Sequence, residues 1–322
     1  MRVTDYYSPG RTPISFEIYP PKTPGAQAQL EAALPRLAKL RPDFMTVTYG
    51  ALGSTRGQSL ALAAGIQREY GLTSASHLTC VGASRSELDE LLRAVRGAGV
   101  ENLMALRGDP PKGLNRFVPP PGGFAHADEL VAHIRDFEFR EGLTPCGLGV
   151  AGYPEKHPEA PDFAADLANL KRKVEAGADF VVTQLFYDNR SYFRFVEAAR
   201  KAGIRAPIVP GLLPVVSGIQ ARRIAAACGA VLPAELDAEL AAAGADEARG
   251  MEIGARQAVG QARELLARGA PGLHFFVMNR ADHIASILKA LRSDRLDEGP
   301  TSRNAPLRPA FLRESLSAQP VP

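Results

Sequence analysis

Two acidic residues stand where they could move a proton or stabilise a positive charge. Glu17 lies inside the otherwise apolar run ISFEIY at residues 14–19, where desolvation of the carboxylate raises its pKa, as a general acid requires. Asp109 follows Gly108 in LRGDPP, so a permissive backbone position precedes it and stiff prolines follow it. The alternatives are a structural ion pair for Glu17 and an ordinary turn residue for Asp109.

Further polar residues occur within or just after other apolar runs. Gln184 in VVTQLFYD could contact the edge of a heterocycle, or it could satisfy a buried backbone group. The basic run at residues 171–173 could bind a pyrophosphate, or it could be a solvated helix face. The other candidates of this kind are Thr48, His77, Arg107, Tyr153, His157, Asn279 and Arg280.

No metal site is predicted, because the chain has no H-x-H, H-E-x-x-H or paired cysteine motif. No motif surrounds His126, His133, His274 or His283, and we assign these four histidines no catalytic chemistry.

The elements that must position these residues follow a regular alternation of strand-like and helix-like segments. We predict strands at residues 14–19, 42–50, 76–82, 102–109, 147–154, 179–188, 207–215 and 273–279, each followed by a helical pattern. Ser84 and Glu87 predict a capping box, and residues 217–269 predict two or three helices broken at Gly229, Pro233 and Gly244.

Eight strand and helix units predict an α/β fold, a (β/α)8 TIM barrel formed by residues 1–293 as a single domain. In such a barrel the active site forms at the C-terminal ends of the strands. A doubly wound sheet is the alternative, disfavoured because no G-x-G-x-x-G follows the first strand. The Pro-, Ser- and Arg-rich residues 294–322 predict a short, flexible C-terminal tail.

The composition of the chain indicates which kinds of binding partner are expected. The 322 residues carry 38 Lys and Arg against 35 Asp and Glu, and a net charge of +3 does not favour nucleic acid. The chain shows no signal peptide and no run of about 18 apolar residues, so we expect a cytoplasmic protein without a membrane partner. Cys80, Cys146 and Cys228 are far apart in the sequence, which predicts buried thiols rather than disulfides.

Several longer sequence blocks occur in a characteristic order between residues 14 and 291. They are SFEIYPPK, VTYGALGSTR, HLTC, LMALRGDPP, AGYPEKHPEA, DLANLKRKVEAGADFVVTQLFYD, PGLLPV and HFFVMNRA. With these blocks the chain resembles the flavin-dependent methylenetetrahydrofolate reductases in their short bacterial form. The resemblance implies an oxidoreductase of one-carbon metabolism and methionine biosynthesis that binds FAD, takes a hydride from NADH or NADPH, and reduces methylenetetrahydrofolate by a ping-pong mechanism. It also implies a homo-oligomer.

The resemblance also implies roles for individual residues. Glu17 corresponds to the general acid that protonates the bridging nitrogen of the folate, and Asp109 to an aspartate whose charge stabilises the resulting iminium cation. The implied folate contacts are Gln184, Gln220 and Arg280. The residues implied to line the FAD are Thr48, Tyr49, Ala51, His77, Arg107, Gly108, Asp109, His126, Ala127, Tyr153, His157, Asp166, Asn169, Arg172 and Lys173.

Two positions depart from the family pattern. His126-Ala127 stands where relatives often have Tyr-Ala beside the flavin, and Ile224 stands where some relatives carry a Phe near the nicotinamide. Two other functions remain as alternatives: a flavin-free pterin-binding barrel acting as a methyl-transfer or carrier subunit, and a non-catalytic binding scaffold.

Overall fold

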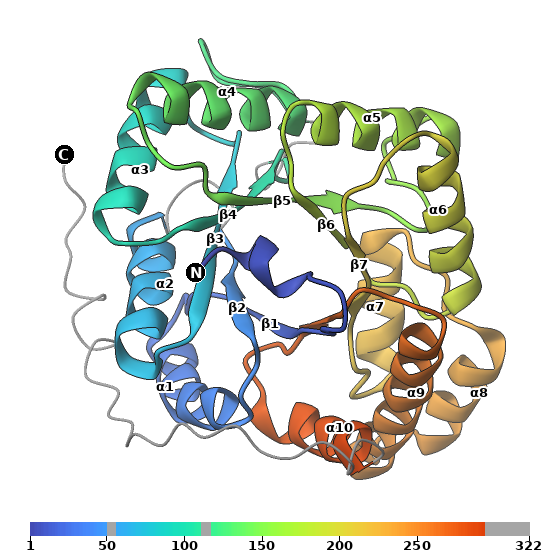
Figure 1. The fold of residues 1–322 in the computed structure, drawn as a ribbon. Helices are drawn as coiled ribbons and strands as arrows, with labels where there is room; N and C mark the ends of the chain where they lie inside the picture. The colour runs from blue at the N-terminus through green and yellow to red at the C-terminus, as the bar shows by residue number, and fades with distance from the viewer. Residues whose placement is uncertain (50–55, 111–116, 294–322) are drawn as a thin grey trace.

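A ring of parallel strands forms the centre of the protein in a computed structural model that describes residues 1–49, 56–110 and 117–293 (Figure 1). The sheet order is β7-β6-β5-β4-β3-β2-β1-β9-β8. The strands are β1 (Ile14–Ile18), β2 (Phe44–Val47), β3 (Thr73–Thr79), β4 (Asn102–Leu106), β5 (Gly147–Gly152), β6 (Phe180–Thr183), β7 (Ile208–Val209), β8 (Gly211–Leu212) and β9 (Leu273–Phe276). The predicted tail at 294–322 lies outside the described residues.

The seventh predicted strand is divided in two at Pro210. Its first half, β7, pairs with β6, and its second half, β8, pairs with β9. The Pro210 carbonyl accepts a hydrogen bond from the His274 N–H at 3.0 Å, and the Gly211 N–H donates to Thr183 Oγ1 at 2.9 Å. The chain therefore changes neighbours at Pro210, and this change closes the ring. The predicted (β/α)8 barrel is confirmed.

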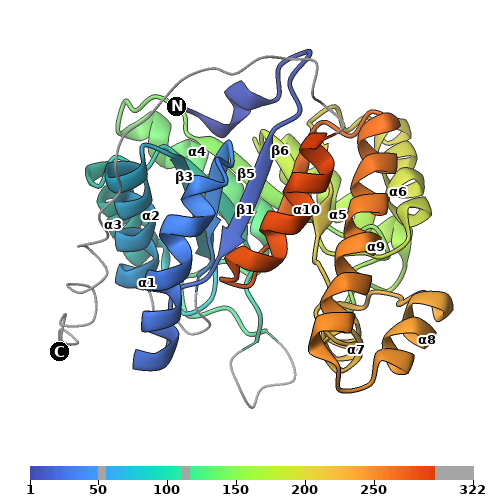
Figure 2. The ribbon, with the colours of Figure 1, turned by 90° about the horizontal axis from the view of Figure 1, so that it is seen from below.

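Helices surround the ring on its outer side (Figures 1 and 2). They are α1 (Pro24–Lys39), α2 (Arg56–Tyr70), α3 (Arg85–Gly97), α4 (Ala127–Arg140), α5 (Phe163–Glu175), α6 (Asn189–Lys201), α7 (Gly218–Cys228), α8 (Ala234–Ala243), α9 (Glu247–Ala267) and α10 (Ala281–Ser293). The capping box of Ser84 and Glu87 at α3 is confirmed, and residues 217–269 form three helices. Within the described ranges, none of these helices has the length and apolar character that a bilayer crossing needs.

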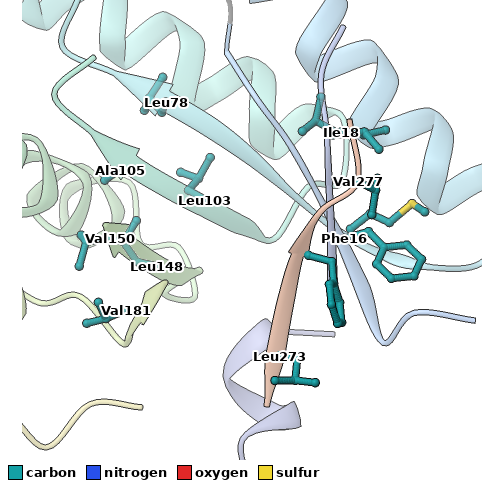
Figure 3. Packing of buried hydrophobic residues seen from close by; sticks show 14 of the residues in the cluster. Phe16, Ile18, Leu78, Leu103, Ala105, Leu148, Val150, Val181, Leu273 and Val277 are labelled. Carbon is teal, nitrogen blue, oxygen red and sulfur yellow. The ribbon is translucent and has the colours of Figure 1, made fainter. Parts of the chain in front are cut away.

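Side chains of the strands alternate between the barrel interior and the layer under the helices. Figure 3 shows this outer layer, to which β1 contributes Phe16 and Ile18. The intervening residues Ser15 and Glu17 therefore face the interior, where Ser15 is buried and Glu17 is partly buried. The alternation of side chains along β1 thus places its two polar residues on the inner face of the barrel.

A short 3-10 helix, η1 (Val3–Tyr6), closes the N-terminal end of the barrel and has no counterpart among the predicted elements. Its Val3 and Tyr6 pack with Phe44, Phe180 and other interior side chains. Figure 2 shows this segment at the end opposite α7 and α8. The interior is therefore filled at one end and accessible at the other.

The cysteines follow the prediction in part. All three are free thiols; Cys80 and Cys146 are buried, whereas Cys228 is partly exposed.

Candidate active site

The C-terminal ends of β1 to β6 and of β9 open into one cavity of about 530 Å³, which is within the roughly 300–1,000 Å³ typical of small-molecule sites. Ala51 lies outside the described residues, and Gln220 and Arg280 are absent from the cavity wall. The other residues to which the family resemblance assigns a role all line the cavity: Glu17, Thr48, Tyr49, His77, Arg107, Gly108, Asp109, His126, Ala127, Tyr153, His157, Asp166, Asn169, Arg172, Lys173 and Gln184.

Glu17 lies between two histidines from different strands. Its Oε2 is 3.4 Å from Nε2 of His77 on β3 and 3.5 Å from Nε2 of His274 on β9. The His274 side chain is 1% exposed, whereas that of Glu17 is 20% exposed. The sequence analysis assigns His274 no catalytic chemistry, and it does not foresee that the ring of His274 lies beside Glu17. A signal was present, because a histidine in the apolar run LHFF is as unusual as the glutamate in ISFEIY.

The expected rise in the pKa of Glu17 is wrong in direction. Burial is the largest influence and raises the pKa, but the contact with His274, the charges of His77 and His274 and the Thr46 hydroxyl together hold it below its usual value. Burial in turn lowers the pKa of His77, against the attraction of Glu17. In sequence Glu17 has only apolar neighbours, whereas the fold brings polar groups to it from β2, β3 and β9.

The turn after β4 depends on Gly108. Its φ is +87°, and a Cβ at this position would lie 2.6 Å from Cγ2 of Val81. This confirms the unusual backbone expected before Asp109, which is exposed at the cavity mouth. On the other side of Gly108, the guanidinium of Arg107 donates two hydrogen bonds to the Glu159 carboxylate, at 2.6 and 2.7 Å. The sequence analysis missed Glu159, although it lies in the block AGYPEKHPEA.

The basic run on α5 is divided between the two alternatives considered for it. Lys171 lies within 3.6 Å of Glu175 one helical turn away and is absent from the cavity wall. Arg172 and Lys173 line the cavity, and Arg172 donates a hydrogen bond to Asn169 at 2.7 Å. One cation therefore belongs to the helix surface and two belong to the site.

Lys173 is the most perturbed cation of the site. Its Nζ donates to the Ala151 carbonyl at 2.5 Å. Burial lowers the pKa of Lys173 to about 8, although Asp166 and Asp128 act in the opposite direction. The Asp166 carboxylate accepts a hydrogen bond from the His157 backbone N–H at 2.9 Å, which fixes the loop after β5 to α5. This wall of the cavity therefore combines cations and carboxylates held by backbone contacts.

The three residues predicted to contact the folate lie in different parts of the structure. Gln184 lines the cavity, and its Oε1 accepts a hydrogen bond from the Leu185 N–H at 2.8 Å, which orients the amide. Gln220 lies in the first turn of α7, where its Oε1 accepts from the Val216 N–H at 3.2 Å. Arg280 is exposed directly before α10. The structure therefore brings only Gln184 to the cavity wall.

Asn279, a candidate from the end of the last strand, has a structural partner. Its Nδ2 donates to the Tyr19 carbonyl at 2.9 Å, and its Oδ1 accepts from the Tyr19 N–H at 3.1 Å. This pair of bonds joins the segment after β1, the strand that carries Glu17, to the segment after β9.

The two departures from the family pattern lie in different surroundings. His126 is the N-cap residue of α4 and lines the cavity. Ile224 packs against a separate apolar cluster that includes Leu213, Ala221 and Ile253. Among the described residues, only the His126 departure reaches the cavity wall.

The two comparisons by sequence agree on one family. A sequence model described as methylenetetrahydrofolate reductase matches residues 2–292. Methylenetetrahydrofolate reductase (NADH) 1 of Arabidopsis thaliana is 38% identical over 308 residues, which cover 93% of this chain and 51% of that relative. The 5,10-methylenetetrahydrofolate reductase of Escherichia coli K12 is 36% identical over 282 residues, which cover 88% and 91%. This chain thus spans about half the length of the plant relative.

The similarity to solved structures is more distant. A protein from Clostridium thermocellum that binds two copies of 5-methyl-5,6,7,8-tetrahydrofolic acid superposes with a TM-score of 0.55 at 13% identity. The superposition covers 88% of this chain and 96% of that one, and it shows a shared fold.

Proposed function

The chain belongs to the methylenetetrahydrofolate reductase family, and we propose that it is an FAD-dependent oxidoreductase that reduces 5,10-methylenetetrahydrofolate to 5-methyltetrahydrofolate with NADH or NADPH. The observation that carries the proposal is the meeting of Glu17, Asp109 and Gln184, from three different strands, around one cavity. The proposal includes a role in one-carbon and methionine metabolism, a cytoplasmic location and a homo-oligomeric state.

The side chains of the cavity fit FAD. A pyrophosphate requires cationic donors, and Arg172, Lys173 and Arg107 supply them on the cavity wall. Sugar hydroxyls require polar partners, which Asp166 and Asn169 offer on α5. When bound, FAD would accept a hydride from the nicotinamide and deliver it to the folate in a ping-pong cycle.

The residues of the chain would act on the folate through protons and charge. Glu17 would donate its proton to the bridging nitrogen of the substrate, so that the bond from this nitrogen to the methylene carbon breaks and an iminium cation forms. The Asp109 carboxylate at the mouth would stabilise this cation. The Gln184 amide, oriented by its own backbone, would hydrogen-bond the polar edge of the pterin.

The lowered pKa of Glu17 sets a condition on this mechanism. The contacts with His274, His77 and Thr46 lower the pKa of Glu17, but burial lowers the pKa of His77 and so favours its neutral form. The Glu17 side chain is still 20% exposed, and substrate binding would exclude water from it. Desolvation favours the protonated carboxylic acid. Glu17 would therefore hold its proton best once the substrate covers the cavity.

The first test is the visible absorption spectrum of the purified protein. We expect a flavin spectrum that bleaches on anaerobic addition of NADH or NADPH, which would also identify the donor. A colourless protein that FAD cannot reconstitute would remove the reductase function and favour a flavin-free pterin-binding barrel that transfers or carries methyl groups.

The second test separates the two half-reactions. Glu17→Gln should leave reduction of the flavin by the nicotinamide unchanged and abolish reduction of the folate, because only the second half-reaction needs the acid. Loss of both half-reactions together would contradict the role of Glu17.

A further inference from the structure

A continuous line of polar side chains runs from Glu17 into the closed interior of the barrel. The Nε2 of His274 faces Glu17 Oε2 at 3.5 Å, and its Nδ1 lies 2.8 Å from Oγ of Ser15. The Ser15 hydroxyl also lies 3.3 Å from the Leu273 carbonyl, to which it can donate. Ser15 and His274 are each 1% exposed. The mechanism proposed above uses neither residue.

The serine hydroxyl has a choice of partner, and the choice decides which nitrogen of His274 carries the proton. In one arrangement Ser15 donates to Nδ1, so the proton of the imidazole is on Nε2 and faces a Glu17 carboxylate. In the other arrangement Ser15 donates to the Leu273 carbonyl and accepts from Nδ1–H. The free lone pair of Nε2 then faces the O–H of a Glu17 carboxylic acid. Both arrangements use the same heavy-atom positions.

We propose that Ser15 and His274 form a two-state hydrogen-bond pair that adapts to both protonation states of Glu17, and that they are positioning residues for the acid. This inference rests on the proposed function, in which Glu17 gives up a proton and regains it in every cycle. The proton leaves Glu17 for the substrate nitrogen and returns from solvent. Ser15 and His274 together carry the same two protons before and after, so no charge accumulates in the barrel.

Among the groups around Glu17, His274 is the one suited to adapt to both protonation states of the acid. Thr46 on β2 contributes a hydroxyl, and Gly211 and Leu212 on β8, which pairs with the strand of His274, carry no ionisable side chain. His77 on β3 is the other titratable group that acts on Glu17. Its Nε2 also faces Oε2, but it lies on the cavity wall, where a ligand can reach it. The contact of His274 with Glu17 is at the outer limit of a hydrogen bond, and such contacts tighten when substrate binds.

Removal of the serine hydroxyl has a predictable sign. In Ser15→Ala, an Nδ1–H of His274 would be buried without an acceptor, which costs more than an unfilled lone pair. The proton of the imidazole therefore moves to Nε2, where it favours the carboxylate form of Glu17. His274→Asn has the opposite effect. Its amide can replace Nδ1 beside Ser15 but is too short to reach Glu17, so burial raises the pKa of the acid.

The experiment measures the titration midpoint of Glu17 in the 322-residue chain without substrate. Infrared difference spectra of the carboxyl group, with Glu17→Gln as the reference, report this midpoint. We expect Ser15→Ala to lower it by about one pH unit or more, which is a tenfold change in proton affinity, and His274→Asn to raise it. Ser15→Thr keeps the hydroxyl and should restore the wild-type midpoint.

The matched control is Ser74→Ala. Ser74 is also a fully buried strand serine, but its hydroxyl donates to the Ala63 carbonyl at 2.8 Å, on the side of α2. This variant should leave the midpoint of Glu17 unchanged. If Ser15→Ala shifts the midpoint no more than Ser74→Ala does, the proposal is wrong. If Ser15→Ala does not fold, the midpoints of Glu17 in Ser15→Thr and His274→Asn test the proposal instead. An unchanged midpoint in His274→Asn overturns it.

A second readout distinguishes this inference from the proposed function. In the flavin-loaded protein, the alkaline limb of the pH profile of folate reduction, along which Glu17 loses its proton, should shift with the midpoint of Glu17, while flavin reduction by the nicotinamide keeps its wild-type rate. A wild-type protein that does not reduce methylenetetrahydrofolate, but whose Glu17 midpoint responds to Ser15 as predicted, would refute the function and support the hydrogen-bond pair. If the wild-type protein reduces methylenetetrahydrofolate but the midpoint of Glu17 does not move in Ser15→Ala, the function is supported and the hydrogen-bond pair is refuted.

Discussion

Replacing Gly108 with Ala should destabilise the protein and disturb the turn that carries Arg107 and Asp109. The φ of +87° is in the left-handed region, where an L-residue costs about 1–2 kcal/mol. The added Cβ would also lie 2.6 Å from Cγ2 of Val81 and 3.2 Å from Cβ of Thr79, and overpacking of this kind costs about 1–3 kcal/mol. We therefore expect a loss of about 2–5 kcal/mol in the free energy of unfolding.

Two further variants separate the backbone contribution from the steric one. Gly71 has a φ of +63° and no atom within 4 Å of an added Cβ, so Gly71→Ala should cost only the conformational 1–2 kcal/mol or so. Val81→Ala removes the Cγ2 that clashes and leaves the Cβ of residue 81 at 3.2 Å. In a double-mutant cycle, Val81→Ala should therefore recover part of the loss caused by Gly108→Ala.

Urea unfolding of the wild type, the three single variants and the double variant of Gly108 and Val81, followed by circular dichroism, measures these differences. The folate half-reaction of Gly108→Ala should also fall by tenfold or more, on the order expected for a displaced catalytic carboxylate, because Asp109 moves with the turn. If Gly108→Ala costs no more than Gly71→Ala and shows no coupling to Val81, the steric reasoning is refuted.

Three other predictions concern separate parts of the structure. FAD affinity should fall by up to about tenfold per pH unit above pH 8, because Lys173, whose pKa burial lowers to about 8, loses its charge there; fluorescence titration of Lys173→Met should show no such slope. Glu138→Gln should cost about 3–5 kcal/mol in urea unfolding, because the buried Glu138 carboxylate pairs with Arg96 at 2.7 Å. Asn279→Ala should raise the KM for folate and leave FAD affinity unchanged, because it breaks both hydrogen bonds to Tyr19 beside the acid.

Each of these predictions has a result that would contradict it. An unaltered pH slope in Lys173→Met would show that another group titrates. A Glu138→Gln protein as stable as wild type would mean that its charge is dispensable between its two arginines. A wild-type KM in Asn279→Ala would remove the link between the Tyr19 backbone and substrate binding.

The features that the sequence predicts correctly are those encoded over short distances along the chain. The capping box of Ser84 and Glu87 spans four residues, and the turn at Gly108 depends on its immediate neighbours. The barrel itself follows from repeated local patterns, because each strand and helix unit carries its own periodicity. The cavity position of most candidate residues then follows from the rule that barrel sites form at strand C-termini.

The features that the sequence does not reveal depend on contacts between distant segments. The contact of Ser15 with His274 joins residues 259 positions apart, and that of Arg107 with Glu159 joins residues 52 apart. The direction of the pKa shift of Glu17 depends on such contacts, because its polar neighbours come from three other strands. The division of the seventh strand at Pro210 likewise depends on which strands it meets on either side.

The pairing of β1 with β9 has a consequence for the order of folding. These two strands are joined by hydrogen bonds across almost the whole chain, and contacts of such long sequence separation form at a high entropic cost. A nascent chain that has not yet added residues 273–276 lacks both the last strand of the ring and the imidazole beside Glu17. Closure of the ring and completion of the polar contacts around Glu17 are therefore one event, which occurs only when the last described strand docks.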